Sequence, residues 1–240
     1  MKIFQLLFLI LFCTGHLFSQ IQKGIKVSTD GLIDSIYGIK KYERLNFSLG
    51  GDSVRYDKKG YSVQGWWEDY YENGNVLHKG YYVDGQLKNY KNFYINGHLE
   101  RSYRQTNIGK SEMTIYYDTD TLKSKVFYVG ESAQKWIDFF PNGKLSFIEE
   151  FDKKAEKLIQ RKFFNEMGIP QSLIEVIDER KQIYAQKEYH ENGRLKEEGK
   201  IFMSGMSGDF QKEELWKYYD EKGKLIREEI YNNGELISTK

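Results

Sequence analysis

The chain has 240 residues, of which 36 are Lys or Arg and 35 are Asp or Glu, so its formal net charge is only +1. This balance argues against nucleic acid as a partner, and against purely electrostatic docking on anionic lipid, because both interactions require a basic surface. The chain contains a single cysteine, which excludes an intramolecular disulfide.

Residues 1–19 have the pattern of a secretory signal peptide. Lys2 precedes an apolar run from Ile3 to Phe12, which is too short to cross a bilayer as a mature helix, and we expect cleavage after Ser19. An uncleaved N-terminal anchor is the alternative. Removing this segment removes Cys13 and leaves 35 basic and 35 acidic residues, since Lys2 is its only charged residue. The sequence therefore predicts export, to the periplasm, the outer envelope or the extracellular space.

Residues 20–65 contain no recognisable repeat. Lys26–Gly31 and Leu45–Tyr56 are typical of strands interrupted by turn residues. A repeat array needs an atypical end that protects its exposed edge. We therefore predict an N-terminal β cap over residues 20–65.

An Asn-Gly motif between apolar residues then recurs to the C-terminus, beginning with Tyr70-Tyr71-Glu72-Asn73-Gly74-Asn75-Val76-Leu77. Such a motif signals a β-hairpin with a type I′ turn, whose two central residues have positive φ. We use the turn glycine of each unit as the reference position; the series is Gly74, Gly97, Asp120, Gly143, Gly168, Gly193 and Gly223. The sequence thus predicts a hairpin repeat array over residues 66–240, with about seven units of 23–30 residues.

A second turn follows each hairpin and is plainest at Asp84-Gly85 and Asn233-Gly234. Each unit is therefore expected to contain two short strands and two tight turns, chained as an antiparallel meander. Lys153–Arg161 and Ile177–Gln186 are the least strand-like segments, and we interpret them as insertions with room for one helical turn. Gly199–Gly208 is expected to be a loop that extends the sixth unit.

Side-chain alternation assigns the aromatic residues to faces. With a two-residue turn, the residue three before the reference faces the residue two after it, which predicts the pairs Tyr71–Val76, Tyr94–Leu99, Tyr117–Leu122 and Phe140–Leu145. Trp67 and Trp136 share that face, and an aromatic residue four before every reference points to the other face. Both faces are thus rich in aromatic residues. The predicted fold class is all-β, an elongated and twisted meander sheet of tandem antiparallel hairpins.

The recurring unit Tyr/Phe-Tyr/Phe-x-Asn-Gly-x-Leu, with Trp at the start of the strand, resembles the bacterial variant of MORN repeats and the YwqK-type antitoxin-like proteins. Trp216–Glu229 is the best match, and the resemblance covers about Trp66 to Leu236. It implies an elongated, grooved hairpin sheet that binds protein or lipid partners without a cofactor. An antitoxin role fits an export signal badly, because a toxin-neutralising protein usually works in the cytoplasm.

No constellation of reactive side chains is evident. His78, His98 and His190 occupy different offsets within the repeat, which argues against a shared metal site. Adjacent carboxylates such as Glu149 and Glu150 should point to opposite faces of a strand. We therefore predict no enzymatic activity, no catalytic residues, no metal site and no cofactor.

The aromatic ladder is the one candidate binding feature. Its rings could stack on sugar rings, a peptide or lipid tails, or they could form the core that thin hairpins need. The candidate ligand platform is Trp67, Tyr71, Tyr94, Tyr117, Trp136, Phe140 and Trp216. We predict a non-catalytic exported module that binds or scaffolds a protein partner at the bacterial envelope. The alternative is recognition of glycan or lipid through one aromatic face, and an antitoxin-like role is third.

Overall fold

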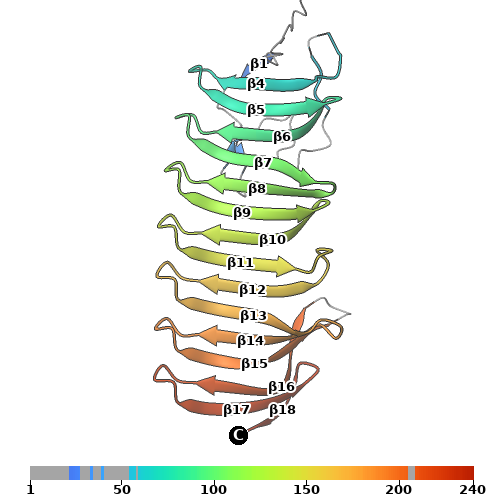
Figure 1. The fold of residues 1–240 in the computed structure, drawn as a ribbon. Coiled ribbons are helices and arrows are strands. Elements are labelled where there is room, and N and C mark those ends of the chain that lie inside the picture. Colours follow the sequence, from blue (N-terminus) through green and yellow to red (C-terminus); the bar gives the residue numbers. More distant parts are fainter. Residues whose placement is uncertain (1–21, 28–32, 35–38, 41–53, 58, 205–208) are drawn as a thin grey trace, which may run out of the picture.

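The computed structural model describes residues 22–27, 33–34, 39–40, 54–57, 59–204 and 209–240, and its regular elements are all strands. Strands β4 to β18 follow one another in a single open, twisted antiparallel sheet, so the predicted all-β hairpin meander is confirmed (Figure 1). The strands are β1 (Gln22–Val27), β2 (Ile33–Asp34), β3 (Ile39–Lys40), β4 (Gly65–Tyr71), β5 (Val76–Val83), β6 (Gln86–Phe93), β7 (Leu99–Asn107), β8 (Lys110–Tyr116), β9 (Leu122–Val129), β10 (Ser132–Phe139), β11 (Leu145–Phe151), β12 (Leu158–Phe164), β13 (Pro170–Asp178), β14 (Ile183–Tyr189), β15 (Leu195–Met203), β16 (Phe210–Tyr219), β17 (Leu225–Asn232) and β18 (Glu235–Thr239).

The N-terminal end of the sheet is formed by β1, which pairs with β4 in parallel orientation. The meander pattern did not predict this parallel pairing. β2 and β3 form a separate two-stranded sheet. The predicted signal peptide and much of the predicted cap, including most of Leu45–Tyr56, lie outside the described residues.

The reference turns have a different geometry from the one we predicted. All seven reference residues have positive φ, from 62° at Asp120 to 90° at Gly74, but Asn73 does not. The Tyr71 N–H donates to Asn75 O at 2.8 Å, and the Gly74 N–H donates to Tyr71 O at 3.0 Å. This is a three-residue loop, a type I turn followed by a left-handed glycine. The type I′ prediction was therefore wrong for this turn.

The asparagine of the reference turn acts through its side chain. Asn73 Oδ1 accepts a hydrogen bond from the Asn75 N–H at 3.0 Å, which caps the type I turn without requiring positive φ. Two consecutive residues with positive φ, as a type I′ turn requires, occur instead in the second turns, at Asp84-Gly85 and Asn233-Gly234. Asn-Gly thus forms two different hairpin turns in the same chain.

The longer loop shifts the cross-strand partners by one residue. The observed pairs are Tyr70–Val76, Phe93–Leu99, Tyr116–Leu122 and Phe139–Leu145. The predicted pairing of Tyr71, Tyr94, Tyr117 and Phe140 with these aliphatic residues was wrong. We call the face that carries Trp67, Asp69 and Tyr71 the core face, and the face that carries Glu68 and Tyr70 the outer face.

The unequal unit lengths arise in the second turns. Two residues connect β5 to β6, whereas residues 152–157 connect β11 to β12 and residues 179–182 connect β13 to β14. The predicted insertions are therefore confirmed in position. The predicted helical turn is absent from the described residues, because β12 and β14 continue through much of the two segments.

Gly199 was expected in a loop but lies within β15. A Cβ atom at this position would overlap the indole ring of Trp216, which covers the strand here. Gly80 in β5 is similar, since a Cβ there would approach His78 Nε2 to 2.5 Å and Leu87 Cδ1 to 2.6 Å. These glycines make room for large side chains on the core face.

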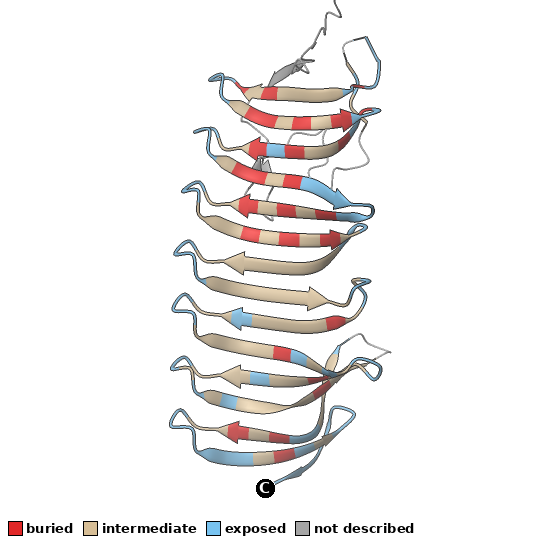
Figure 2. Cartoon of the chain, viewed as in Figure 1, coloured by how far each residue is buried: buried red, intermediate tan, exposed pale blue. Residues whose placement is uncertain are grey.

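Buried residues form two clusters on the core face (Figure 2). The first contains Val63, Tyr71, Leu77, Tyr82, Leu87, Tyr90, Tyr103, Met113, Ile115, Val126 and Tyr128, and the second contains Leu158, Ile174, Tyr184, Ile201, Trp216 and Tyr218. Between them, β10 and β11 contain no buried residue. The two buried clusters are therefore separated at the centre of the array.

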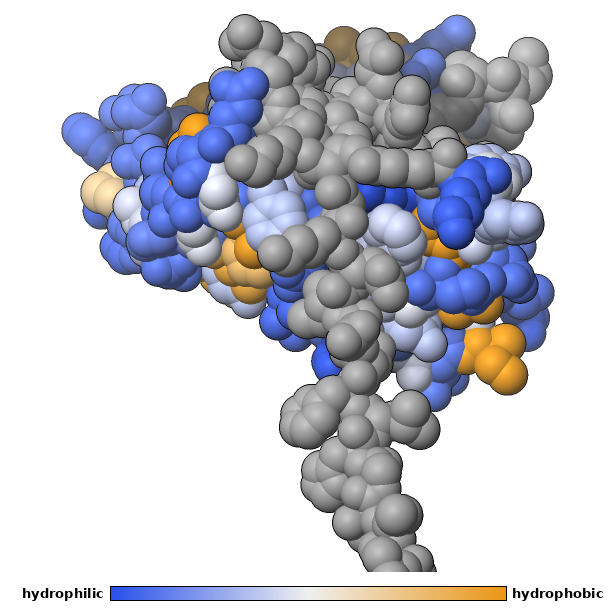
Figure 3. Space-filling view, turned by 90° about the horizontal axis from the view of Figure 1, so that it is seen from above, coloured by the Kyte–Doolittle hydropathy of each residue, from blue (hydrophilic) through white to orange (hydrophobic). Residues whose placement is uncertain are grey.

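Seen from above, the coloured surface is mostly hydrophilic, with scattered apolar residues (Figure 3). Within the part of the chain that the structure describes, no helix is long and apolar enough to cross a membrane.

Candidate functional site

The histidines lie in three separate environments. His78 is fully buried on the core face, where its Nδ1 is 2.7 Å from Asn92 Oδ1 and its Nε2 is 3.0 Å from the Tyr82 hydroxyl. His98 lies in a reference turn, with Nδ1 2.9 Å from Asp120 Oδ2. Over the described ranges, no group of three or more His, Cys, Asp or Glu side chains is arranged to hold a metal ion.

Adjacent carboxylates point to opposite faces, as predicted. Glu149 Oε1 on the core face accepts from Arg161 Nε at 2.7 Å, whereas Glu150 Oε2 on the outer face accepts from Lys135 Nζ at 2.9 Å. Each carboxylate is therefore paired with a basic residue of a neighbouring strand, and the two do not converge on a common site. This arrangement stabilises the sheet through cross-strand pairs.

Hydrogen bonds at the turn edge link the first three units to the units that follow them. The hydroxyls of Tyr71, Tyr94 and Tyr117 donate to the carbonyl oxygens of Phe93, Tyr116 and Phe139, at 2.7, 2.8 and 2.9 Å. These tyrosines stand three residues before the reference in consecutive units, and each acceptor belongs to the aromatic residue four before the next reference. The same hydrogen bond therefore recurs between neighbouring hairpins.

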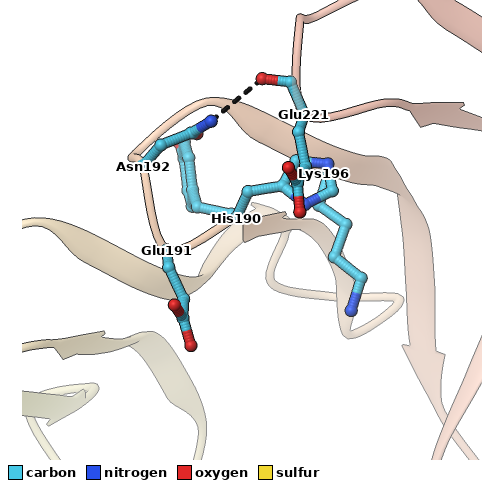
Figure 4. Close-up of a pocket in the computed structure, with 6 residues that line it drawn as sticks. His190, Glu191, Asn192, Lys196 and Glu221 are labelled. Carbon is cyan, nitrogen blue, oxygen red and sulfur yellow. Dashed lines mark hydrogen bonds between the residues drawn. The ribbon is translucent and has the colours of Figure 1, made fainter.

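His190 takes the place of tyrosine in the sixth unit. Its Nε2 donates to Tyr219 O at 2.9 Å. Asn192 Nδ2 donates to Glu221 O at 2.9 Å (Figure 4). The surrounding hollow is lined by Tyr189, His190, Glu191, Asn192, Lys196 and Glu221. Because the histidine and the asparagine amide both bond to backbone, we assign this hollow a structural role.

The candidate platform residues are not equally accessible. Tyr71 and Trp216 are 0% exposed, so neither offers ring surface to a ligand. Trp67, Tyr94, Tyr117, Trp136 and Phe140 are half-buried. Trp67 and Trp136 pack against opposite ends of the first buried cluster. The structure therefore spreads the platform over the core face and brings only part of it together.

Tyr117, Trp136 and Phe140 line one hollow at the centre of the core face, which we call the central hollow. Its volume is about 330 Å³, and its other lining residues are Ile115, Lys123, Ser124, Asp138, Phe139 and Ser146. Ser124 on β9 stands opposite Asp138 on β10. The hollow lies at β10 and β11, which contain no buried residue, and of its rings Trp136 packs against the first cluster.

Three polar residues, Lys123, Ser124 and Asp138, line the central hollow beside the rings. The Trp136 indole N–H donates to Asp138 Oδ1 at 2.7 Å, which orients the ring. Lys123 Nζ lies 5.5 Å from the centroid of the Tyr117 ring. Burial, and then the nearby Asp138 carboxylate, raises the pKa of Tyr117, so its hydroxyl stays protonated and continues to donate to Phe139 O. Sequence reasoning identified the rings but missed Lys123, Ser124 and Asp138.

In every unit, the outer face carries an aromatic residue paired with an aliphatic residue or proline. Each aromatic residue is half-buried and lies beside the aliphatic residue or proline two positions after the reference. We call this row the outer stripe; it consists of Tyr70–Val76, Phe93–Leu99, Tyr116–Leu122, Phe139–Leu145, Phe164–Pro170, Tyr189–Leu195 and Tyr219–Leu225. Since neighbouring strands are about 4.8 Å apart, equivalent pairs recur roughly every 10 Å along the array.

Comparison with known families gives a consistent result. Residues 64–84, 185–201 and 215–233 match the MORN repeat variant. No curated protein matches the chain. The matched segments contain the first, sixth and seventh reference turns, and the same hairpin recurs in the four units between them. MORN repeats are generally associated with binding and membrane-interaction roles. The matches and the fold together support a MORN-repeat protein.

Proposed function

We propose that this chain is an exported, non-catalytic module that binds or scaffolds a protein partner through the outer stripe. The observation that carries the proposal is the repetition, in all seven units, of a half-exposed aromatic residue paired with an aliphatic residue or proline. A row of this kind presents apolar contact area at a regular interval, and aromatic side chains dominate the energetics of protein interfaces.

The charges beside the outer stripe favour protein over lipid. Lys79 pairs with Glu68 at 3.0 Å and Lys135 pairs with Glu150 at 2.9 Å, so the charged rows next to the stripe contain both signs. A surface that binds anionic lipid or nucleic acid carries an excess of basic residues. The whole chain lacks that excess, with 36 basic and 35 acidic residues.

A site-specific photocrosslinker tests the proposal in intact cells. Placed at Phe139 on the outer stripe, it should form one discrete protein adduct. Placed at Phe163, which is 44% exposed on the core face, it should not. A Leu145→Ser substitution beside the Phe139 probe should weaken the adduct while leaving the far-UV circular dichroism unchanged.

Equal adducts from both faces, or no adduct from Phe139, would contradict the proposed function. Flotation with liposomes distinguishes the lipid alternative, which requires binding that depends on the same stripe. Export is tested separately by fractionating the cells and sequencing the N-terminus of the mature protein. We expect the chain to begin at Gln20 in an envelope or extracellular fraction.

A further inference from the structure

The central hollow contains a buried polar group that the protein itself does not satisfy. Ser124 is 3% exposed, and its Oγ has no hydrogen-bond partner among the described residues. Leaving a buried hydroxyl unpaired costs about 1–3 kcal/mol. Ser124 lines the central hollow of about 330 Å³ on the core face. A ligand with polar groups of its own would satisfy its hydroxyl.

The charges of the hollow narrow the class of ligand. Lys123 and Asp138 lie on neighbouring strands and have opposite signs. Asp138 accepts the Trp136 indole N–H through Oδ1 and forms no ion pair with any residue in the described ranges. An anionic ligand would face Asp138 and a cationic one would face Lys123, whose ammonium already lies over the Tyr117 ring. An uncharged ligand avoids both conflicts.

The rings indicate a ligand with an apolar face as well as polar groups. The Tyr117 and Phe140 rings come from equivalent positions of consecutive units, and the hydrogen bond to Asp138 holds the Trp136 indole in place. An aliphatic lipid tail would cover these rings but would leave the Ser124 hydroxyl without a partner and would desolvate the Asp138 carboxylate, which is costly. A sugar ring has an apolar C–H face and hydroxyls around its rim, and therefore satisfies both requirements.

We propose that the central hollow binds one pyranose ring of an uncharged glycan. The ring stacks on Trp136 between Tyr117 and Phe140, its hydroxyls hydrogen-bond to Ser124 Oγ and to the Asp138 carboxylate, and Lys123 donates to a ring or hydroxyl oxygen. The volume lies at the lower end of the roughly 300–1,000 Å³ found for ligand pockets, which suits one ring rather than a long chain. This site goes beyond the proposed protein-binding function, because it lies on the opposite face.

The test uses the full mature chain and three neutral probes, cellotetraose, chitotetraose and maltotetraose. Tryptophan fluorescence and calorimetry should show saturable binding of at least one probe. Ser124→Ala should weaken that binding about five- to tenfold, the equivalent of one hydrogen bond, and should leave thermal stability unchanged or raised. Ser111→Ala is the matched control, because Ser111 is 6% exposed on the neighbouring strand β8 and does not line the hollow.

Trp136→Ala should abolish binding, whereas Trp136→Phe should retain part of it because a ring remains for stacking. The proposal is overturned by the absence of saturable binding of all three probes up to about 10 mM, a limit chosen because single-ring sites are weak. It is equally overturned by binding that Ser124→Ala and Trp136→Ala leave unchanged. A cationic peptide or a liposome that binds in a Trp136-dependent manner, in place of the sugars, would also reject it. Adducts at Phe139 report on the outer stripe alone, so either proposal can fail without the other.

Discussion

The buried His78 makes a specific prediction about acid sensitivity. Burial lowers the pKa of His78 to about 4 from its usual 6.5, with Arg55 also lowering it, and Asn92 and Asp69 opposing the shift. Because Asn92 Oδ1 can only accept, the proton of the neutral imidazole is on Nδ1, and Nε2 accepts from the Tyr82 hydroxyl. Protonating Nε2 would place a second donor against that hydroxyl, which already accepts from Arg55 NH1 at 3.3 Å.

The sign of the effect follows from proton uptake. Between pH 6.5 and 4 the unfolded chain binds a proton at His78 that the folded chain does not, so stability falls as the pH falls through this window. Above pH 6.5 the contribution is fully present. Between pH 7.5 and 4.5 the loss amounts to about 2.5 kcal/mol, taking 1.36 kcal/mol for each pKa unit.

Urea unfolding followed by fluorescence at the two pH values measures the loss. Other groups also titrate, so the informative quantity is the difference between the wild type and His78→Gln, which keeps a donor and an acceptor but does not titrate. We expect the variant to lose about 2.5 kcal/mol less than the wild type over this range. His98→Gln, in an exposed turn, is the control for replacing a histidine elsewhere in the sheet. The same pH dependence in His78→Gln as in the wild type would refute the assignment.

Three further substitutions test how the array is built, each measured by the urea midpoint. Gly199→Ala should destabilise by about 2 kcal/mol, because its Cβ overlaps the Trp216 indole; a neutral result would mean that Trp216 moves freely. Tyr94→Phe should cost about 1 kcal/mol by removing the hydrogen bond to Tyr116 O, and an unchanged midpoint would show that water replaces it. Asp120→Gly should stabilise by about 0.5 kcal/mol, because φ is 62° there; destabilisation would indicate that the Asp120 contact with His98 matters more.

The repeat register was predictable because it depends on single residues with a backbone constraint. The reference position has positive φ in every unit, and only Gly or a residue such as Asp120 accepts that conformation readily. The turn type was not predictable from the same residues. Asn-Gly satisfies both a type I′ turn and a type I turn closed by a left-handed glycine, and the choice depends on whether Asn73 Oδ1 caps the turn. That choice moved every cross-strand partner by one residue.

The candidate site was predictable only by residue type. Trp136 and Trp216 occupy the same offset in their units, yet Trp216 is 0% exposed and Trp136 lines a hollow. The difference comes from neighbours on adjacent strands: Gly199 beside Trp216 lets the indole lie flat against the sheet, whereas Trp136 stands between Val126 and Glu149. A single sequence does not show such neighbours until the register is known. Ser124 carries no sequence signal at all.

The two faces of the sheet differ in how far their side chains repeat from unit to unit. The reference turn and the outer stripe repeat in each unit, because every hairpin needs the same turn. The core face varies from unit to unit, from the buried His78 near one end to the Lys212 ammonium 3.9 Å from the Trp216 ring centroid near the other. A partner that contacts the outer stripe therefore meets a periodic surface, and its affinity should grow with the number of units it spans. A ligand on the core face meets a unique set of side chains at each unit. Selective recognition of a small molecule is thus expected there, in the central hollow at β8 to β11.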